Sequence, residues 1–211
     1  MFRALMGPGK FITFEGIEGS GKSTQIDMLH KHLELRGHQV HRLREPGGTA
    51  VGDRIRAILL DPALSEMTDI TEMLLFAASR AQLIRQEVRP ALAAGKTVLC
   101  DRFVYSSLAY QAYARGLPVA TVRAANAPAI EGLLPDKVVL LDLPPNVALQ
   151  RAKARAALDR IEAEALSFHE AVRRGFLEEA EADSDRFCVI LAEGSPEDIH
   201  GRILDGLEAL L

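Results

Sequence analysis

The segment Gly16–Ser23, with the sequence Gly-Ile-Glu-Gly-Ser-Gly-Lys-Ser, combines residue types and spacing that can bind a chain of phosphates. It matches G-x-x-x-x-G-K-[ST], the phosphate-binding loop of proteins that use ATP or GTP. Glycines let the backbone turn tightly so that several N–H groups point into one concavity, and a helix starting near Gly21 adds the positive end of its dipole. The Lys22 ammonium would then hold the β- and γ-phosphates, and the Ser23 hydroxyl is a ligand for Mg²⁺.

The residues on both sides of this loop predict the strand and the helix that the motif needs. Residues 10–14 predict a short apolar strand, and residues 23–36 predict an amphipathic helix with Ile26, Leu29 and Leu33 at helical spacing. This context favours a functional phosphate loop over a glycine-rich turn that binds nothing. The ATP-binding residues predicted from it are Gly16, Ile17, Glu18, Gly19, Ser20, Gly21, Lys22, Ser23 and Thr24.

Short apolar strands alternate with longer helical patterns along the chain. The predicted strands are 11–15, 39–43, 97–101, 137–142 and 186–191. The predicted helices are 22–36, 51–60, 69–94, 103–114, 118–128, 146–157, 161–183 and 196–210, with Gly37 and Gly95 as helix C-caps. Val138–Leu141 is apolar throughout, as in a parallel strand covered on both faces. The alternation predicts an α/β fold in which helices wrap a parallel sheet.

Composition restricts the class of protein. The chain has 211 residues, of which 48% are apolar and 26% charged, as is typical of one globular domain. A net charge of −4 argues against a nucleic-acid-binding surface, and no apolar run approaches the length of a membrane span. Cys100 and Cys188 lie in apolar runs and are predicted to be free thiols in buried strands, so a cytoplasmic location is expected. The six histidines lack metal-ligand spacing and are predicted on the surface.

Residues that follow the predicted strands are candidates for a site, because ligands of parallel sheets bind at the carboxyl ends of the strands. Polar and turn residues occur there at 44–49, 101–103 and 142–145. Asp101 closes a strand beside the phosphate loop, where a carboxylate can hold Mg²⁺ directly or through water. A helix N-cap is the equally open alternative, and one residue could do both.

Two groups of side chains recur at helical spacing. Arg102, Ser106 and Tyr110 are four residues apart and would share a face that offers a guanidinium, a hydroxyl and an aromatic ring. Phe76 and Arg80 are also four apart, and could stack on a flat base and hydrogen-bond its edge. Core packing with a surface charge is the alternative for both groups.

Residues 151–160 form a basic run in an acidic protein. A solvated helix face is one explanation. The other is a lid whose arginines close over a site, stabilise the charge of a phosphoryl group in transfer and exclude water.

The order of these segments along the chain resembles that of bacterial thymidylate kinase, from about Lys10 to near the C-terminus. The resemblance rests on Phe14-Glu15-Gly16 with the phosphate loop and on residues 44–49, 74–82, 101–103, 106–111 and 158–162. It implies phosphorylation of dTMP to dTDP with ATP and Mg²⁺, in dTTP biosynthesis. It also implies a P-loop nucleoside monophosphate kinase fold with a five-stranded parallel sheet flanked by helices. The expected organisation is one domain over 1–211 with a mobile lid at about 150–162, assembled as a homodimer without nucleic-acid or membrane partners.

The resemblance implies roles for individual residues as well. The expected dTMP-binding residues are Glu18 at the sugar 3′-hydroxyl, Arg56 and Arg102 at the phosphate, Phe76 and Arg80 at the base, Tyr110 at the 2′ position, and Ser106 and Gln111 in the same pocket. The expected metal ligands are Ser23 and Asp101. Members of the family carry a catalytic arginine in the phosphate loop or in the lid. Because this loop has none, the expected catalytic residues are Lys22, Arg102 and the lid residues Arg151, Lys153 and Arg155.

The chain departs from the family pattern at a few positions that leave these contact residues in place. Ser79 stands where an Asp is usual, Asp53 replaces a common Glu, and Ala112 and Ala114 replace glycines that often follow Tyr-Gln.

Two other classes of function remain as alternatives: a different small-molecule kinase, and a non-metabolic protein that is either a GTPase switch or an ATPase partner module. A kinase for another small molecule on the same scaffold would differ in its substrate preference. A GTPase switch would need a guanine-reading Asn-Lys-x-Asp motif, and neither Asn126 nor Asn146 is followed by Lys. A DNA-partitioning ATPase would be expected to show a broad basic surface, which the net charge does not support.

Overall fold

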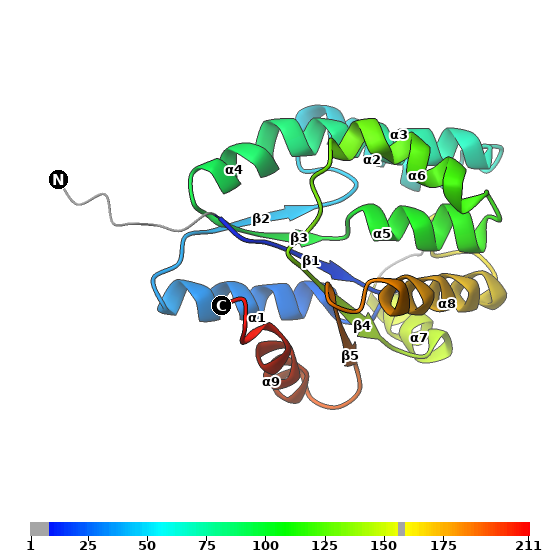
Figure 1. Ribbon diagram of the computed structural model, residues 1–211. Coiled ribbons are helices and arrows are strands. Elements are labelled where there is room, and N and C mark those ends of the chain that lie inside the picture. Colours follow the sequence, from blue (N-terminus) through cyan, green and yellow to red (C-terminus); the bar gives the residue numbers. More distant parts are fainter. Residues whose placement is uncertain (1–8, 156–158) are drawn as a thin grey trace.

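The computed structural model describes residues 9–155 and 159–211. Within these residues, five parallel strands form one sheet in the order β2-β3-β1-β4-β5 (Figure 1). The strands are β1 (Phe11–Glu15), β2 (Val40–Arg44), β3 (Thr97–Asp101), β4 (Lys137–Asp142) and β5 (Phe187–Leu191). The predicted α/β fold and parallel sheet are confirmed, and no strand boundary differs from its prediction by more than one residue.

The order of the strands places a ligand crevice at the centre of the sheet. Strands β2 and β3 lie on one side of β1 and strands β4 and β5 on the other, so the direction of winding reverses beside β1. Sheets of this type bind ligands outside the carboxyl ends of the strands at that reversal. The register sets Asp101 of β3 beside Phe14 of β1 and Arg44 of β2, so the residues that follow these strands meet at one edge.

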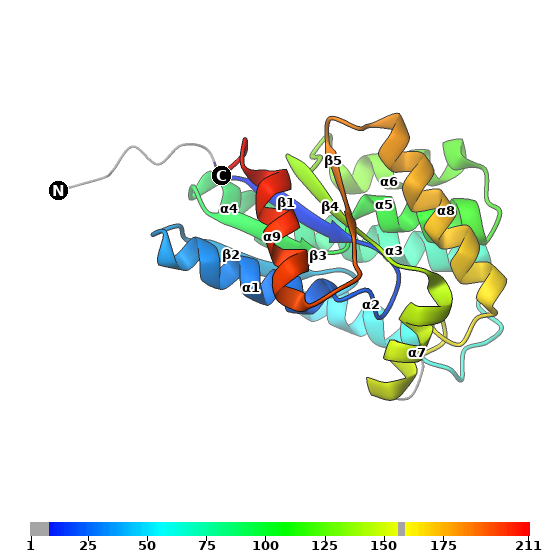
Figure 2. The same cartoon turned by 90° about the horizontal axis from the view of Figure 1, so that it is seen from below.

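Helices cover both faces of the sheet. Helices α1 and α9 lie on one face, and the other face carries α3, α4, α5 and α6, with α8 packed against α5 and η2 (Figures 1 and 2). The helices are α1 (Lys22–Leu35), α2 (Ala50–Leu60), α3 (Asp69–Leu83), η1 (Ile84–Val88), α4 (Arg89–Ala93), α5 (Val104–Ser107), η2 (Leu108–Ala114), α6 (Val119–Ile130), α7 (Pro145–Arg155), α8 (Leu166–Ala182) and α9 (Pro196–Leu207).

Local signals in the sequence account for many helix ends. Thr49 caps α2 by accepting the N–H of Gly52, and Ser195 forms a capping box at the start of α9. Gly37 and Gly95 have positive φ just after α1 and α4, which confirms both as the predicted C-caps.

Three helical predictions differ from the structure in the type of helix or by more than three residues at one end. The helix predicted over 161–183 begins at Leu166, because the Asp159 carboxylate accepts the N–H groups of Ile161 and Glu162 and holds a turn there. The helix predicted over 103–114 widens into the π-helix η2, and that over 69–94 contains the π-helix η1. Such widenings often occur at functional sites. The helix predicted over 146–157 is α7, and its last predicted residues lie outside the described ones.

Burial confirms one prediction about the cysteines and overturns one about the histidines. Cys100 is buried in β3 and Cys188 is half-buried in β5, and both are free. His169 was predicted on the surface, which is wrong, because it is fully buried on α8. It shares the buried face of this helix with Val172 and Phe176, at helical spacing. Among the described residues, no helix is long and apolar enough to cross a membrane.

Candidate active site

Three glycines give the phosphate loop its shape between β1 and α1. Gly16, Gly19 and Gly21 have φ values of 130°, 78° and 97°, a region that residues with side chains rarely adopt. A Cβ atom on Gly19 would overlap the backbone of Ala148, so helix α7 packs directly against the loop. The start of α7 is therefore in contact with the phosphate-binding segment.

Lys22 begins α1 and is buried inside the loop. Its Nζ donates to the carbonyl oxygens of Gly16 and Ile17, both at 2.9 Å. Burial lowers the pKa of Lys22 to about 8, and the nearby guanidinium of Arg102 acts in the same direction. The ammonium group is thus positioned where phosphate oxygens could replace the two carbonyl oxygens.

Ser23 and Asp101 bring two oxygen donors together beside Lys22. The Ser23 Oγ lies 3.3 Å from Asp101 Oδ2. The N-cap position of α5 is occupied by Phe103, so Asp101 is not the cap of that helix. A hydroxyl and a carboxylate are hard oxygen ligands of the kind that Mg²⁺ prefers. Within the described residues, no group of three or more His, Cys, Asp or Glu is arranged to hold a metal ion.

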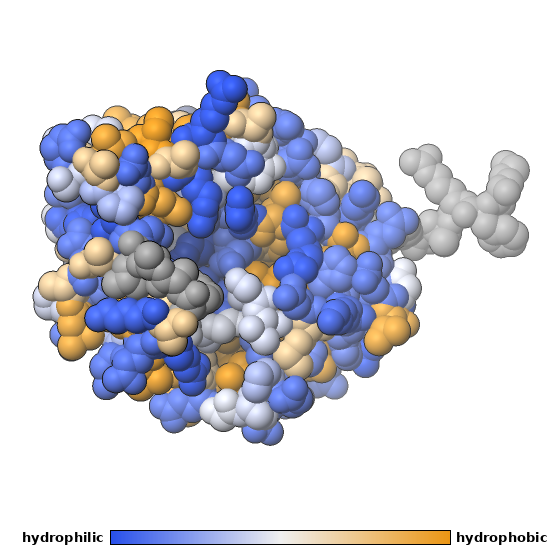
Figure 3. Space-filling model, turned by 180° about the vertical axis from the view of Figure 1, so that it is seen from behind, coloured by the Kyte–Doolittle hydropathy of each residue, from blue (hydrophilic) through white to orange (hydrophobic). Residues whose placement is uncertain are grey.

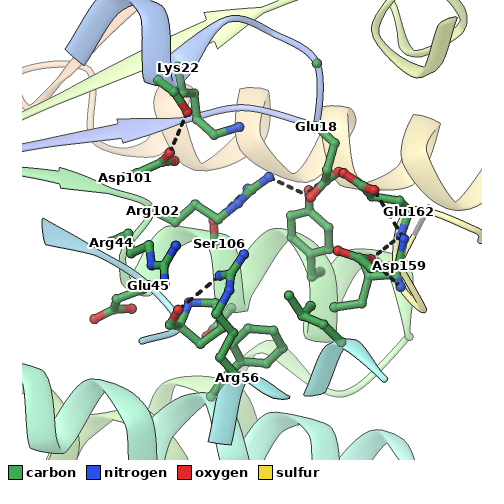
Figure 4. Close-up of a pocket in the computed structure, with 18 of the residues that line it drawn as sticks. Glu18, Lys22, Arg44, Glu45, Arg56, Asp101, Arg102, Ser106, Asp159 and Glu162 are labelled. Carbon is green, nitrogen blue, oxygen red and sulfur yellow. Dashed lines mark hydrogen bonds and ion pairs between the residues drawn. The ribbon is translucent and has the colours of Figure 1, made fainter. Parts of the chain in front are cut away.

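A cavity of about 390 Å³ opens next to the phosphate loop. The surface is hollowed here among mainly hydrophilic side chains (Figure 3). Arg56, Arg102 and Glu18 are directed into this space (Figure 4). The predicted site residues that line it are Glu18, Gly19, Gly21, Lys22, Ser23, Thr24, Arg56, Phe76, Asp101, Arg102, Ser106, Tyr110 and Gln111.

Arg102 connects the phosphate loop with the helix that follows β3. Its backbone has a φ of 70°, which is unusual for a residue with a side chain and is often found at functional sites. Its guanidinium donates to Glu18 Oε1 at 2.6 Å and to Ser106 Oγ at 3.1 Å, and lies 5.1 Å from the centre of the Tyr110 ring. Burial opposes the charge, but Tyr110 and Glu18 hold the pKa of Arg102 above its ordinary value. Arg102, Ser106 and Tyr110 thus lie together as predicted, although Arg102 precedes α5 instead of lying on the helix.

Two carboxylates of the same region have opposite pKa shifts. Glu15, which ends β1, accepts the Ser106 hydroxyl at 2.6 Å and the Phe103 N–H at 2.8 Å, and burial raises its pKa to about 7. Burial would also raise the pKa of Glu18, but Arg102 and Lys22 outweigh it and hold this pKa below the ordinary value. Glu18 therefore presents a charged carboxylate at the cavity. Glu15 does not line the cavity and instead holds Ser106 and the Phe103 backbone in place.

Arg80 does not face the cavity, contrary to the expectation that it would hydrogen-bond a base. It is 1% exposed, and all its N–H groups are engaged by the protein. The Glu45 carboxylate lies 2.8 Å from its Nε and 2.6 Å from Nη2, which also donates to the Phe103 carbonyl at 3.0 Å. Its Nη1 donates to Ser107 Oγ at 3.0 Å and to Asn126 Oδ1. Arg80 thus orients Ser107, which lines the cavity.

The amide of Gln111 is oriented by a buried carboxylate. Its Nε2 donates to Glu72 Oε1 at 2.9 Å, and Glu72 also binds Arg115 at 3.1 Å and Arg160 at 2.6 Å. Burial alone would raise the pKa of Glu72, but Arg115 and Gln111 hold it below the ordinary value. With its nitrogen engaged, Gln111 presents Oε1, which has no hydrogen-bond partner among the described residues. The cavity therefore contains an oriented acceptor.

Residues 14–203 match the sequence profile of the family described as thymidylate kinase. This chain belongs to the thymidylate kinase family. The thymidylate kinase of Desulfovibrio desulfuricans is 48% identical over 208 residues, which cover 95% of this chain and 96% of the relative. That of Deinococcus radiodurans is 48% identical over 198 residues, covering 94% and 96%. That of Geotalea uraniireducens is 50% identical over 188 residues, covering 86% and 88%. The protein is a nucleoside monophosphate kinase that phosphorylates thymidylate, as its sequence predicted.

Two of the predicted lid residues of this kinase do not line the cavity. Arg151 and Lys153 are exposed on α7, and neither lines the cavity. The side chain of Arg155 lies outside the described part of the chain. The segment after α7 returns to the cavity, where Asp159 is part of the lining, and Arg160 anchors it by donating to Leu59 O at 2.9 Å in addition to Glu72.

Several cavity residues of the kinase had no predicted role, although most lie in segments that the sequence had already marked, at 44–49, 106–111 and 158–162. They are Arg44, Glu45, Pro46, Leu60, Ser107, Asp159, Ile161 and Glu162. Arg44 ends β2 at the same edge as the phosphate loop, where residues that follow the predicted strands were expected to form a site. Glu15 was also missed, although its position just before Gly16 marks it as a neighbour of the loop. Gly16, Ile17 and Ser20 belong to the predicted loop but do not line the cavity.

Proposed function

We propose that this kinase transfers the γ-phosphoryl group of ATP to the phosphate of dTMP and releases dTDP for dTTP synthesis. The observation that carries this proposal is that one cavity joins the phosphate loop to Arg102, Phe76 and Gln111. A donor phosphate chain on the loop and an acceptor nucleotide on the opposite wall would then face each other. Phosphoryl transfer depends mainly on such positioning and on compensation of charge.

ATP binding would exchange the partners of Lys22. In the structure, two carbonyl oxygens of the loop accept from its Nζ at 2.9 Å. The β- and γ-phosphate oxygens are stronger, charged acceptors and would take their place. Ser23 and Asp101 would hold Mg²⁺, which neutralises charge on the β- and γ-phosphates when bound.

The dTMP phosphate would bind to Arg102, with Arg56 beside it. Both guanidinium groups line the cavity, and Arg56 is held in place by donating to the Pro46 carbonyl at 3.0 Å. Glu18 would accept the hydrogen bond of the sugar 3′-hydroxyl, and Tyr110 would crowd a ribose 2′-hydroxyl. These roles agree with the charges in the cavity. The cationic Arg102 and Arg56 would face the negative phosphate, and the Glu18 carboxylate would face the neutral 3′-hydroxyl donor.

The base would stack on Phe76 and be read by Ser107 and Gln111. Ser107 Oγ accepts from Arg80, and its own O–H would donate to the O4 carbonyl of thymine. The Oε1 acceptor of Gln111, which has no hydrogen-bond partner among the described residues, would take the N3–H of thymine. Cytosine carries an amino group at C4 and an acceptor at N3, so it presents the opposite pattern at both positions. Binding of cytosine would leave the Ser107 hydroxyl and the Gln111 acceptor without matching partners on the base, and these unpaired buried polar groups would disfavour it.

The segment at about 150–162 would act as a lid within a single domain. Its cations at 151, 153 and 155 would approach the transferring phosphoryl group when the lid closes. The contact between α7 and the phosphate loop at Gly19 supports this, because a small movement of α7 relative to the loop would change the distance of these side chains from the phosphates.

A homodimer and a cytoplasmic location complete the proposal. Exposed apolar side chains lie on adjoining helices, at Ile58 on α2, Ile70 and Leu74 on α3, and Val119 on α6, and this face suits a second copy. The free thiols of both cysteines suit a reducing compartment. Light scattering would test the assembly and should give the mass of two chains.

The activity is tested by incubating the protein with ATP, Mg²⁺ and dTMP and separating the nucleotides by chromatography. Equal amounts of dTDP and ADP are expected, and chelation of the metal should abolish both. ADP without dTDP would show that the phosphoryl group goes to water or to another acceptor and would refute the proposal.

A further inference from the structure

His169 is a buried polar side chain with no hydrogen bond in the described structure. It lies on α8, is 0% exposed, and neither ring nitrogen has a hydrogen-bond partner among the described residues. Its Nδ1 lies 3.9 Å from Oε2 of Glu18, and its ring packs edge-on against Phe168 at 5.5 Å between centroids. Native structures rarely leave a buried polar group unpaired, so such a group requires an explanation.

Glu18 is the neighbour that could use this nitrogen. Its carboxylate now accepts from Arg102 at 2.6 Å and from the Tyr110 hydroxyl at 2.8 Å. Arg102 and Lys22 are also the charges that keep its carboxylate ionised. In the proposed function, the dTMP phosphate binds Arg102 and the ATP phosphates bind Lys22. Substrate binding would therefore weaken the interactions that position the Glu18 carboxylate and keep it ionised.

We infer that His169 is a positioning residue that replaces Arg102 as a partner of Glu18 when dTMP binds. The Nδ1–H group would donate to Oε2 and hold the carboxylate toward the sugar 3′-hydroxyl. A hydrogen bond needs a separation of about 2.9 Å, so a movement of about 1 Å closes the gap. His169 acts only through Glu18, because it does not line the cavity itself. The inference rests on the proposed function, specifically on the pairing of Glu18 with the 3′-hydroxyl.

The test compares two substrates in variants of residue 169. His169→Leu removes both nitrogens at similar volume, whereas His169→Asn keeps an N–H donor close to the position of Nδ1. Each variant is assayed for kcat/KM with dTMP and with 3′-deoxy-dTMP, which lacks the hydroxyl that Glu18 would bind. His169→Leu should lower kcat/KM for dTMP about tenfold and change that for 3′-deoxy-dTMP less than twofold. His169→Asn should restore most of the loss.

Two controls separate positioning from packing. His200→Leu replaces another histidine, on α9 and away from the cavity, and should leave both values unchanged. In a Glu18→Gln background, His169→Leu should add little further loss, because the two residues act on the same group.

The outcomes are distinct. An equal fall for both substrates would mean that His169 only packs the core, and an unchanged dTMP value would mean that it has no role; either overturns the inference. If His169→Leu does not fold, His169→Asn is compared with His169→Gln, whose donor lies at the Nε2 position. The inference then requires that kcat/KM for dTMP, divided by kcat/KM for 3′-deoxy-dTMP, be higher in His169→Asn than in His169→Gln. Equal ratios in the two variants overturn it. Failure of the unmodified enzyme to phosphorylate dTMP would instead refute the proposed function.

Discussion

Glu15→Gln should make the protein more stable at high pH and leave its stability almost unchanged at low pH. Burial raises the pKa of Glu15 from 4.5 to about 7 in the folded state. A carboxyl group with a raised folded-state pKa favours folding most where it is protonated in both states. This contribution is complete below pH 4.5 and is lost as the pH rises through 7. The difference between the two pKa values corresponds to about 3 kcal/mol.

Gln is a suitable replacement because it keeps an acceptor oxygen for the Phe103 N–H and places its amide beside the Ser106 hydroxyl. The free energy of unfolding is measured by urea titration at pH 5, 6, 7 and 8 for the wild type and the variant. The advantage of the variant should grow by about 2 to 3 kcal/mol from pH 5 to pH 8, because a part of the effect is already present at pH 5. Glu15→Ala, which also loses both hydrogen bonds, should show the same pH dependence with an added constant loss. A difference between wild type and Glu15→Gln that does not vary with pH would refute the reasoning.

Three further predictions follow from the site and from the surface. Lys22→Ala removes the charge shared by the β- and γ-phosphates, so kcat should fall by about two or more powers of ten while far-UV circular dichroism stays unchanged; near wild-type turnover would contradict this. Arg151→Ala with Arg155→Ala should lower kcat much more than dTMP affinity, and a kcat within about threefold of wild type would exclude the lid cations. Burial lowers the pKa of His32, as does Arg36, and burial and His32 lower that of His200, so their contribution to stability is present above pH 6.5 and is lost as the pH falls. The fall in melting temperature below pH 6.5 should therefore be shallower in His200→Leu, and an unchanged slope would refute this.

The strands and the phosphate loop could be predicted from the sequence because their signals are local. A run such as Val138–Leu141 has to be covered on both faces whatever the rest of the chain does. The glycines and Lys22 at their fixed spacing demand a strand before them and a helix after them, and both are present. The grouping of Arg102, Ser106 and Tyr110 was also predictable, because residues spaced at intervals of four share a face of a helix, although Arg102 itself lies just before α5.

The side chains that depend on partners far along the chain could not be predicted. Arg80 is drawn away from the cavity by Glu45 and Asn126, and no spacing in the sequence reveals that pairing. His169 is buried because α8 packs against η2, and this contact cannot be predicted from the sequence of α8 alone. The family resemblance supplied residue roles, but the orientation of Gln111 by Glu72 is visible only in the structure.

The central claim is that the cavity beside the phosphate loop reads thymine, and a panel of acceptors tests it most directly. ADP release is measured with ATP and Mg²⁺ for dTMP, dUMP, dCMP, dAMP and dGMP. Turnover should be strongest with dTMP and weaker with dUMP, which lacks a methyl group worth about 0.8 kcal/mol of burial. It should be near background with dCMP, whose base reverses the donor and acceptor that Ser107 and Gln111 expect, and with both purines. Turnover of a cytosine or purine nucleotide as fast as that of dTMP would contradict the account.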